Sequence, residues 1–98
     1  MNTAMAISFS ARVSAPADVL VSQLAGESVI LNLNSECYFG LDEMGTNMWT
    51  ALTKAESIQA AYDSLLAEYE VSADQLKQDL TELLDKLIDK GLLEVAES

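Results

Sequence analysis

The chain contains no histidine, one cysteine and one proline among its 98 residues. Without histidine it cannot build a Ser-His-Asp group, a Cys-His group or a histidine-based metal site. Its lone cysteine, Cys37, cannot form an internal disulfide, which is typical of a reducing compartment. No calcium-loop pattern or glycine-rich phosphate loop occurs either. We therefore expect a protein that is not an enzyme and that holds no metal or cofactor.

Basic residues are also scarce, since five Lys and Arg stand against sixteen Asp and Glu, for a formal net charge of −11. Nucleic-acid binding requires clustered cations to neutralise phosphates, and no such cluster occurs. The longest apolar run, Ala4 to Ile7, is too short for a signal core or a membrane span. Because half of the residues are hydrophobic, the chain can still bury one modest core. We expect a cytoplasmic protein that binds neither nucleic acid nor membrane.

The first half of the chain predicts a flexible arm and three short strands. The arm covers residues 1–17, which are mostly small and polar, and alternation around Phe9 leaves open that part of it docks as a strand. The strands are expected at residues 18–25, 28–33 and 37–41. Turns at Gly26 and at a polar Asn-Ser-Glu sequence separate them, and connections this short favour antiparallel hairpins.

The second half predicts three helices, whose N-caps are expected at Asp42, Ser57 and Ser72. The first helix runs to about Lys54 and directs Met44, Met48 and Trp49 into the core. The third begins at a capping box and ends near Lys90, with Gly91 as a left-handed terminator. Its apolar side chains are Leu76, Leu80, Leu83, Leu84, Leu87 and Ile88. They cover more than the roughly 100° that core packing needs, which indicates either a groove floor or deeper burial.

Two sequence patterns resemble the PqqD family of peptide-recognition elements. These are YFGLDEMG…W at 38–49 and D-L-x-x-L-L…K-G-L-L at 79–93, and the resemblance covers residues 18–95. It implies an α+β, winged-helix-like domain, in which a three-stranded antiparallel sheet packs on three helices. Family members bind the leader segment of a ribosomally synthesised precursor peptide as a fourth strand, beside the third strand and against the third helix.

The resemblance also assigns residues to leader binding in this chain. The strand edge is expected at Cys37, Tyr38, Phe39, Gly40 and Leu41, and the groove wall at Leu76, Asp79, Leu80 and Leu83. The aromatic strand followed by G-L-D-x-x-G is similar to the stand-alone recognition proteins of lasso-peptide pathways. Their leaders carry a Tyr-x-x-Pro element, whose ring and proline need apolar pockets. The implied function is a non-catalytic adaptor that presents the leader to a leader peptidase and a cyclase.

Three other functions remain open at the level of sequence. The same fold could serve as the peptide chaperone of pyrroloquinoline-quinone biosynthesis, although strands richer in Arg and Trp are typical there. The Asp63-Ser64-Leu65 sequence is similar to the attachment site of an acyl carrier protein, but Ser64 falls in mid-helix and strands precede it. A winged-helix DNA reader is disfavoured by the negative charge.

Overall fold

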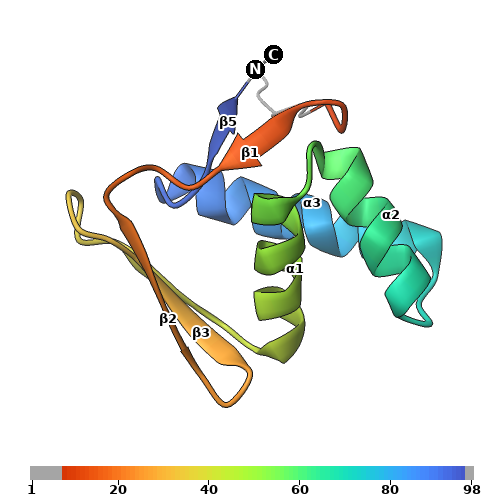
Figure 1. The fold of residues 1–98 in the computed structure, drawn as a ribbon, viewed down its shortest axis with the longest axis horizontal. Coiled ribbons are helices and arrows are strands. Elements are labelled where there is room, and N and C mark those ends of the chain that lie inside the picture. The colour runs from red at the N-terminus through yellow and green to blue at the C-terminus, as the bar shows by residue number, and fades with distance from the viewer. Residues whose placement is uncertain (1–7, 97–98) are drawn as a thin grey trace.

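The structure is a computed structural model that describes residues 8–96 (Figure 1). An antiparallel sheet has the order β2-β3-β4, where β2 is Val19–Leu24, β3 is Glu27–Asn32 and β4 is Tyr38–Leu41. The helices are α1 (Glu43–Lys54), α2 (Ile58–Glu68) and α3 (Ala73–Asp89). Two short strands, β1 (Arg12–Ser14) and β5 (Glu94–Ala96), form a second antiparallel sheet. The expected α+β architecture, a three-stranded sheet on three helices, is confirmed.

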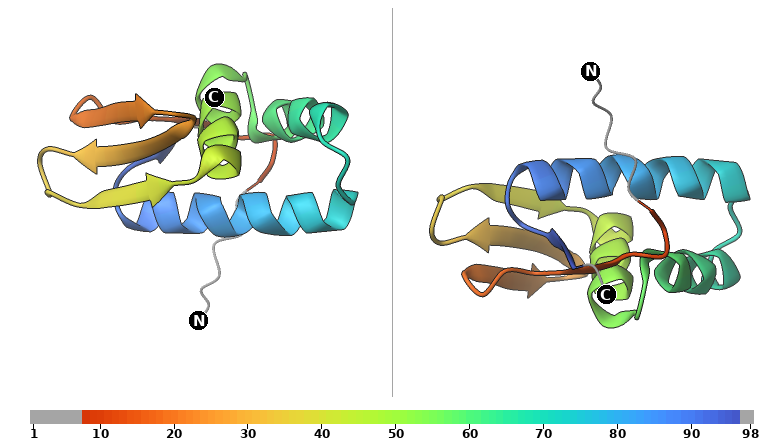
Figure 2. Two further views of the ribbon diagram at one scale, coloured as in Figure 1. Left: turned by 90° about the horizontal axis from the view of Figure 1, so that it is seen from below. Right: turned by 90° about the horizontal axis from the view of Figure 1, so that it is seen from above.

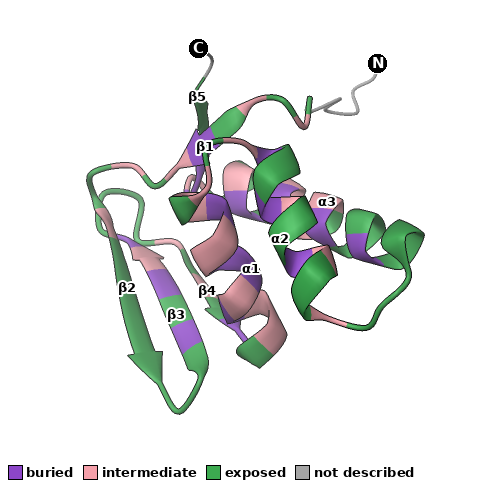
Figure 3. Cartoon of the chain, turned by 45° about the vertical axis from the view of Figure 1, so that its right-hand side comes forward, coloured by how far each residue is buried: buried purple, intermediate pink, exposed green. Residues whose placement is uncertain are grey.

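The three-stranded sheet has one covered and one open face. Along β3 the buried residues Ser28, Ile30 and Asn32 alternate with less buried ones, as Figure 3 shows by colour. The register places Phe39 opposite Ile30 and Tyr38 opposite Leu31. We call the side of Ile30 and Phe39, which packs on the helices, the inner face, and the side of Leu31 and Tyr38 the outer face.

The helices begin and end where the local chemistry predicts. The side chains of Asp42, Ser57 and Ser72 accept hydrogen bonds from the backbone N–H groups of Gly45, Ala60 and Gln75. After α3, Gly91 adopts a φ of 74°, which is left-handed, and Leu92 N–H donates to the Leu87 carbonyl at 2.8 Å. Within residues 8–96, none of the helices is both long and apolar enough to cross a membrane.

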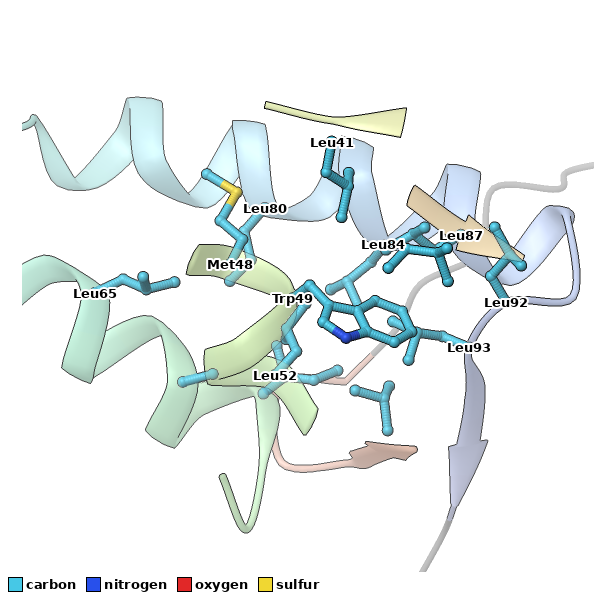
Figure 4. Packing of buried hydrophobic residues seen from close by; sticks show 14 of the residues in the cluster. Leu41, Met48, Trp49, Leu52, Leu65, Leu80, Leu84, Leu87, Leu92 and Leu93 are labelled. Atoms are coloured by element: carbon cyan, nitrogen blue, oxygen red, sulfur yellow. The ribbon is translucent and has the colours of Figure 1, made fainter. Parts of the chain in front are cut away.

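The core lies where α1 and α3 meet the inner face of the sheet (Figure 4). Trp49 of α1 is surrounded by leucines from α1, from α3 and from the segment after Gly91. The predicted core positions of Met48 and Trp49 are confirmed, because both side chains are buried. Met44 is only half-buried, one turn before Met48.

Residues 8–17 of the predicted arm are docked, an outcome that the alternation around Phe9 left open, and the strand that they form is β1. Val13 is only 2% exposed and pairs with Val95 of β5. The Phe9 carbonyl accepts a hydrogen bond from Gln59 N–H at 2.7 Å, and the Phe9 ring meets Tyr62 edge to face. Residues 1–7 lie outside the described residues. The segment 8–17 therefore docks against β5, α1 and the start of α2, and it does not pair with β4.

Asn32 ties the sheet to the end of α3, and we expect its loss to destabilise the fold. Its Nδ2 donates to the Gly91 carbonyl at 2.8 Å, and its Oδ1 accepts from the N–H groups of Asn34 and Ser35. Because the side chain is buried, Asn32→Ala should lower the free energy of unfolding by about 1–3 kcal/mol in urea denaturation. The exposed Asn34 gives a matched control, Asn34→Ala, which should cost less than about 0.5 kcal/mol. Equal losses in the two variants would contradict this role.

Candidate functional site

The edge of β4 that faces away from β3 carries no strand among residues 8–96. The docked N-terminal segment pairs with β5 and leaves this edge open. Both views in Figure 2 show β4 as the strand of the sheet nearest to α3. The opposite edge of the sheet, along β2, also carries no strand among residues 8–96, whereas the groove beside α3 lies at β4. An open edge beside a helix is where an extended peptide can add a strand.

Hydrogen-bond alternation identifies which backbone groups of β4 face the open edge. Asn32 N–H donates to the Cys37 carbonyl at 2.8 Å, so these opposed residues form a hydrogen-bonded pair. In an antiparallel ladder such pairs alternate with pairs that do not bond each other. The backbone groups of Phe39 therefore turn toward β3, and those of Tyr38 and Gly40 turn away from it. These two residues offer the donors and acceptors that a guest strand requires.

A shallow groove of about 430 Å³ runs between β4, the start of α1 and α3. Its lining residues are Phe39, Gly40, Leu41, Asp42, Met44, Gly45, Met48, Asp79 and Leu83. Two features bring α1 close to the sheet at this point. A Cβ on Gly45 would lie 3.1 Å from Cδ2 of Leu41, which is tight, so glycine permits the approach. In addition, the hydroxyl groups of Ser28 and Thr46 form a buried hydrogen bond of 2.7 Å.

The groove contains five of the nine residues that the resemblance assigns to leader binding. Those five are Phe39, Gly40, Leu41, Asp79 and Leu83. Tyr38 has its side chain on the outer face, and Cys37 lies just before β4 and half-buried. Leu76 and Leu80 are 1% and 0% exposed, so they belong to the core and do not line the groove. The expected groove wall is corrected in this respect: Asp79 and Leu83 form it, and the two leucines support it from within.

Sequence reasoning missed the contribution of α1 to the groove. Met44 and Met48 were expected in the core. Met48 is buried as expected and also lines the groove, whereas Met44 is half-buried and lines it at the start of α1. The signal that points to them is Asp42, because a cap directly after Leu41 places the first turn of α1 beside β4. Methionine side chains are flexible and adapt to differently shaped apolar partners.

The charged residues that line the groove are both acidic. Asp42 Oδ1 accepts from Gly45 N–H, and Asp79 Oδ1 accepts from Gln75 Nε2, each at 2.8 Å. No Lys or Arg lines the groove, and no group of three or more metal-ligating residues occurs within residues 8–96. An apolar floor with two carboxylates at its rim suits an extended apolar segment that also carries a basic side chain.

Ser64, the residue of the carrier-protein alternative, is exposed in the interior of α2. It therefore lacks the helix-start position of a carrier attachment site. Ser64, Lys54 and Glu68 line a hollow between α1 and α2, and no strand edge borders this hollow. The carrier interpretation is not supported by this arrangement.

Comparisons with known proteins show the family and the fold of this chain. The sequence profile described as "Coenzyme PQQ synthesis protein D (PqqD)" matches residues 27–93. The structure of TbiB1 in complex with the TbiA(beta) leader peptide is similar, with a TM-score of 0.75 and 32% identity over 83% of this chain and 94% of that one. A lasso peptide synthetase B1 complexed with its leader peptide has the same fold, with a TM-score of 0.74 and 22% identity over 85% and 98% of the two chains. No match was found among curated proteins. Since the profile covers well over half of its length, this chain belongs to the PqqD family.

Proposed function

We propose that this chain is a non-catalytic, cytoplasmic adaptor of lasso-peptide biosynthesis. Residues 18–95 bind the leader segment of a ribosomally synthesised precursor peptide as a fourth strand along β4. The chain then presents the bound leader to a leader peptidase and a cyclase, which raises the effective concentration of the precursor at each enzyme. The open edge of β4 beside an apolar groove carries the proposal. The likeness to TbiB1, a protein solved with a leader peptide, supports it.

Affinity and specificity have different sources in this arrangement. Backbone hydrogen bonds to Tyr38 and Gly40 tolerate many guest sequences and contribute roughly 0.5–1.5 kcal/mol each. Specificity comes from the groove, where alternate side chains of the guest meet Phe39, Met44 and Leu83. A few apolar anchors buried there supply most of the affinity. The Asp79 carboxylate at the rim favours a guest with a Lys or Arg nearby.

Titration with a leader peptide tests the proposal directly. The probe is a synthetic leader of the cognate precursor peptide, and the TbiA(beta) leader serves as a second probe. We expect amide shifts in the isotope-labelled chain to concentrate in β4, the first turn of α1 and α3. The N–H groups of Tyr38 and Gly40 should become protected from hydrogen exchange. A scrambled leader is the control, and absence of binding well into the micromolar range would refute the proposal.

The peptide chaperone of pyrroloquinoline-quinone biosynthesis is the second candidate, because the matching profile carries that description. It uses the same edge with a different client peptide. Competition between the two client peptides for the labelled chain separates the candidates. We expect the lasso-type leader to displace the quinone-precursor peptide, and the reverse order of affinity would favour the chaperone.

A further inference from the structure

Both methionines within residues 8–96 lie in the groove beside β4. Met44 and Met48 stand one helical turn apart on α1, so their side chains share one face of the helix. They line the groove together with Phe39 and Leu83. The two thioether groups therefore lie at the surface where the proposed leader makes its apolar contacts.

The two thioethers differ in their exposure to solvent. Met48 is only 4% exposed, and Figure 4 shows its side chain between α1 and α3. Met44 is half-buried in the first turn of α1. Because a dissolved oxidant must reach the sulfur atom before it can react, we expect Met44 to be oxidised before Met48.

A change in the Met44 side chain should leave the start of α1 intact. The Asp42 side chain accepts the capping hydrogen bond from Gly45 N–H at 2.8 Å, and the Asp42 carbonyl accepts from Thr46 N–H. Neither bond involves the Met44 side chain. Oxidation of Met44 therefore changes the surface of the groove and keeps the cap that positions it.

Hydrogen peroxide would convert the apolar Met44 side chain into a polar one. A lone pair of the sulfur attacks one peroxide oxygen, and the S–O bond forms as the O–O bond breaks. The departing hydroxide takes the proton of the new sulfur-bound hydroxyl and becomes water, which leaves the sulfoxide. The sulfur loses two electrons and the peroxide gains them. Since peroxide is neutral, the Asp42 and Asp79 carboxylates in the groove do not repel it as they repel an anionic oxidant.

The groove has no side chain that can compensate the sulfoxide oxygen. Its lining residues include no Lys, Arg, Ser, Thr, Asn or Gln, and its two carboxylates accept hydrogen bonds without donating them. Water satisfies the sulfoxide oxygen while the groove is empty. A leader strand that covers the groove removes this water, and the unpaired polar atom then opposes binding.

We propose that Met44 is an oxidation site whose sulfoxide form prevents leader binding. This inference rests on the proposed function, because the sulfoxide acts through the groove that binds the leader. A bound leader in turn shields the sulfur, so the loaded adaptor is oxidised more slowly than the empty one. A methionine sulfoxide reductase restores binding: the oxygen leaves as water, and a dithiol supplies two electrons and becomes a disulfide.

The test combines peroxide treatment with removal of each sulfur atom. The unsubstituted chain, Met44→Leu and Met48→Leu are treated with hydrogen peroxide and then with dithiothreitol, which reverses sulfenic acids and disulfides at Cys37 but not methionine sulfoxide. Met1 and Met5 are present in all three chains, so the comparison isolates the groove. Peptide mass spectrometry locates the added oxygen. Calorimetry measures the affinity for the cognate leader before and after treatment.

We expect oxygen to be added first at Met44 and leader affinity to fall about tenfold in the unsubstituted chain and in Met48→Leu. Met44→Leu should keep its own untreated affinity after treatment. Met44→Gln, which carries a polar side chain of similar length, should reproduce the loss without peroxide. Excess leader should slow the oxidation of Met44 several-fold, and the melting temperature of the oxidised chain should change by less than about 3 °C.

Three results would overturn the inference. The first is normal leader binding by a chain that carries the oxygen at Met44. The second is an equal loss of affinity in treated Met44→Leu, and the third is oxidation of Met44 only under conditions that unfold the chain. An untreated chain that binds no leader would instead refute the proposed function, and this inference with it, before any peroxide is added.

Discussion

Gly40→Pro should lower the affinity for the leader by about 10- to 100-fold while the domain stays folded. Proline removes the Gly40 N–H, which faces the open edge and takes no part in the pairing of β4 with β3. A guest carbonyl opposite this position then loses its donor and is left unsatisfied at the interface. Edge strands accept proline where the N–H would face solvent, so the cost to folding is small.

Gly40→Ala is the matched control for this substitution. It keeps the N–H group, and its Cβ would meet no atom within 4 Å. Calorimetric titration should therefore give nearly unchanged leader affinity for the alanine variant, and melting curves should agree within a few degrees for both variants. If the proline variant unfolds, a leader N-methylated at the residue opposite Gly40 probes the same pair from the guest's side. Normal binding in both experiments would show that the leader does not pair with β4.

Elements whose determinants are local could be predicted from the sequence. The cap of each helix depends on one side chain and a backbone N–H three residues later, so Asp42, Ser57 and Ser72 were identified correctly. The left-handed Gly91 is of the same kind. Short turns also fixed the antiparallel order of β2, β3 and β4.

Features that depend on distant parts of the chain could not be predicted in this way. The pairing of Val13 with Val95 joins opposite ends of the domain, and neither three-residue strand has a recognisable pattern of its own. Alternation in β4 shows that Tyr38 and Phe39 face opposite sides but does not show which side is buried. The partner residue decides this, because Phe39 lies opposite the fully buried Ile30.

The wide apolar stripe of α3 could be interpreted only from the residues that pack around it. Two leucines of this stripe differ in burial, and their loss should therefore affect stability differently. Leu80 is fully buried, whereas Leu83, one turn further along the helix, is half-buried and lines the groove. Leu80→Ala should lower the free energy of unfolding by about 2–5 kcal/mol, because it opens a cavity in the core. For a domain of this size the melting temperature should fall by about 10 °C or more.

Leu83→Ala removes the same atoms from the same helix and should have the opposite balance of effects. Its half-buried side chain contributes less to folding, so the stability loss should stay near or below about 1 kcal/mol. Leader affinity should fall about 5- to 30-fold, because a guest side chain loses its apolar contact in the groove. Urea denaturation and leader titration on both variants, at a temperature where Leu80→Ala remains folded, separate the two roles. A Leu83→Ala variant that binds the leader normally would show that the guest does not occupy the groove beside β4, because Leu83 lines that groove.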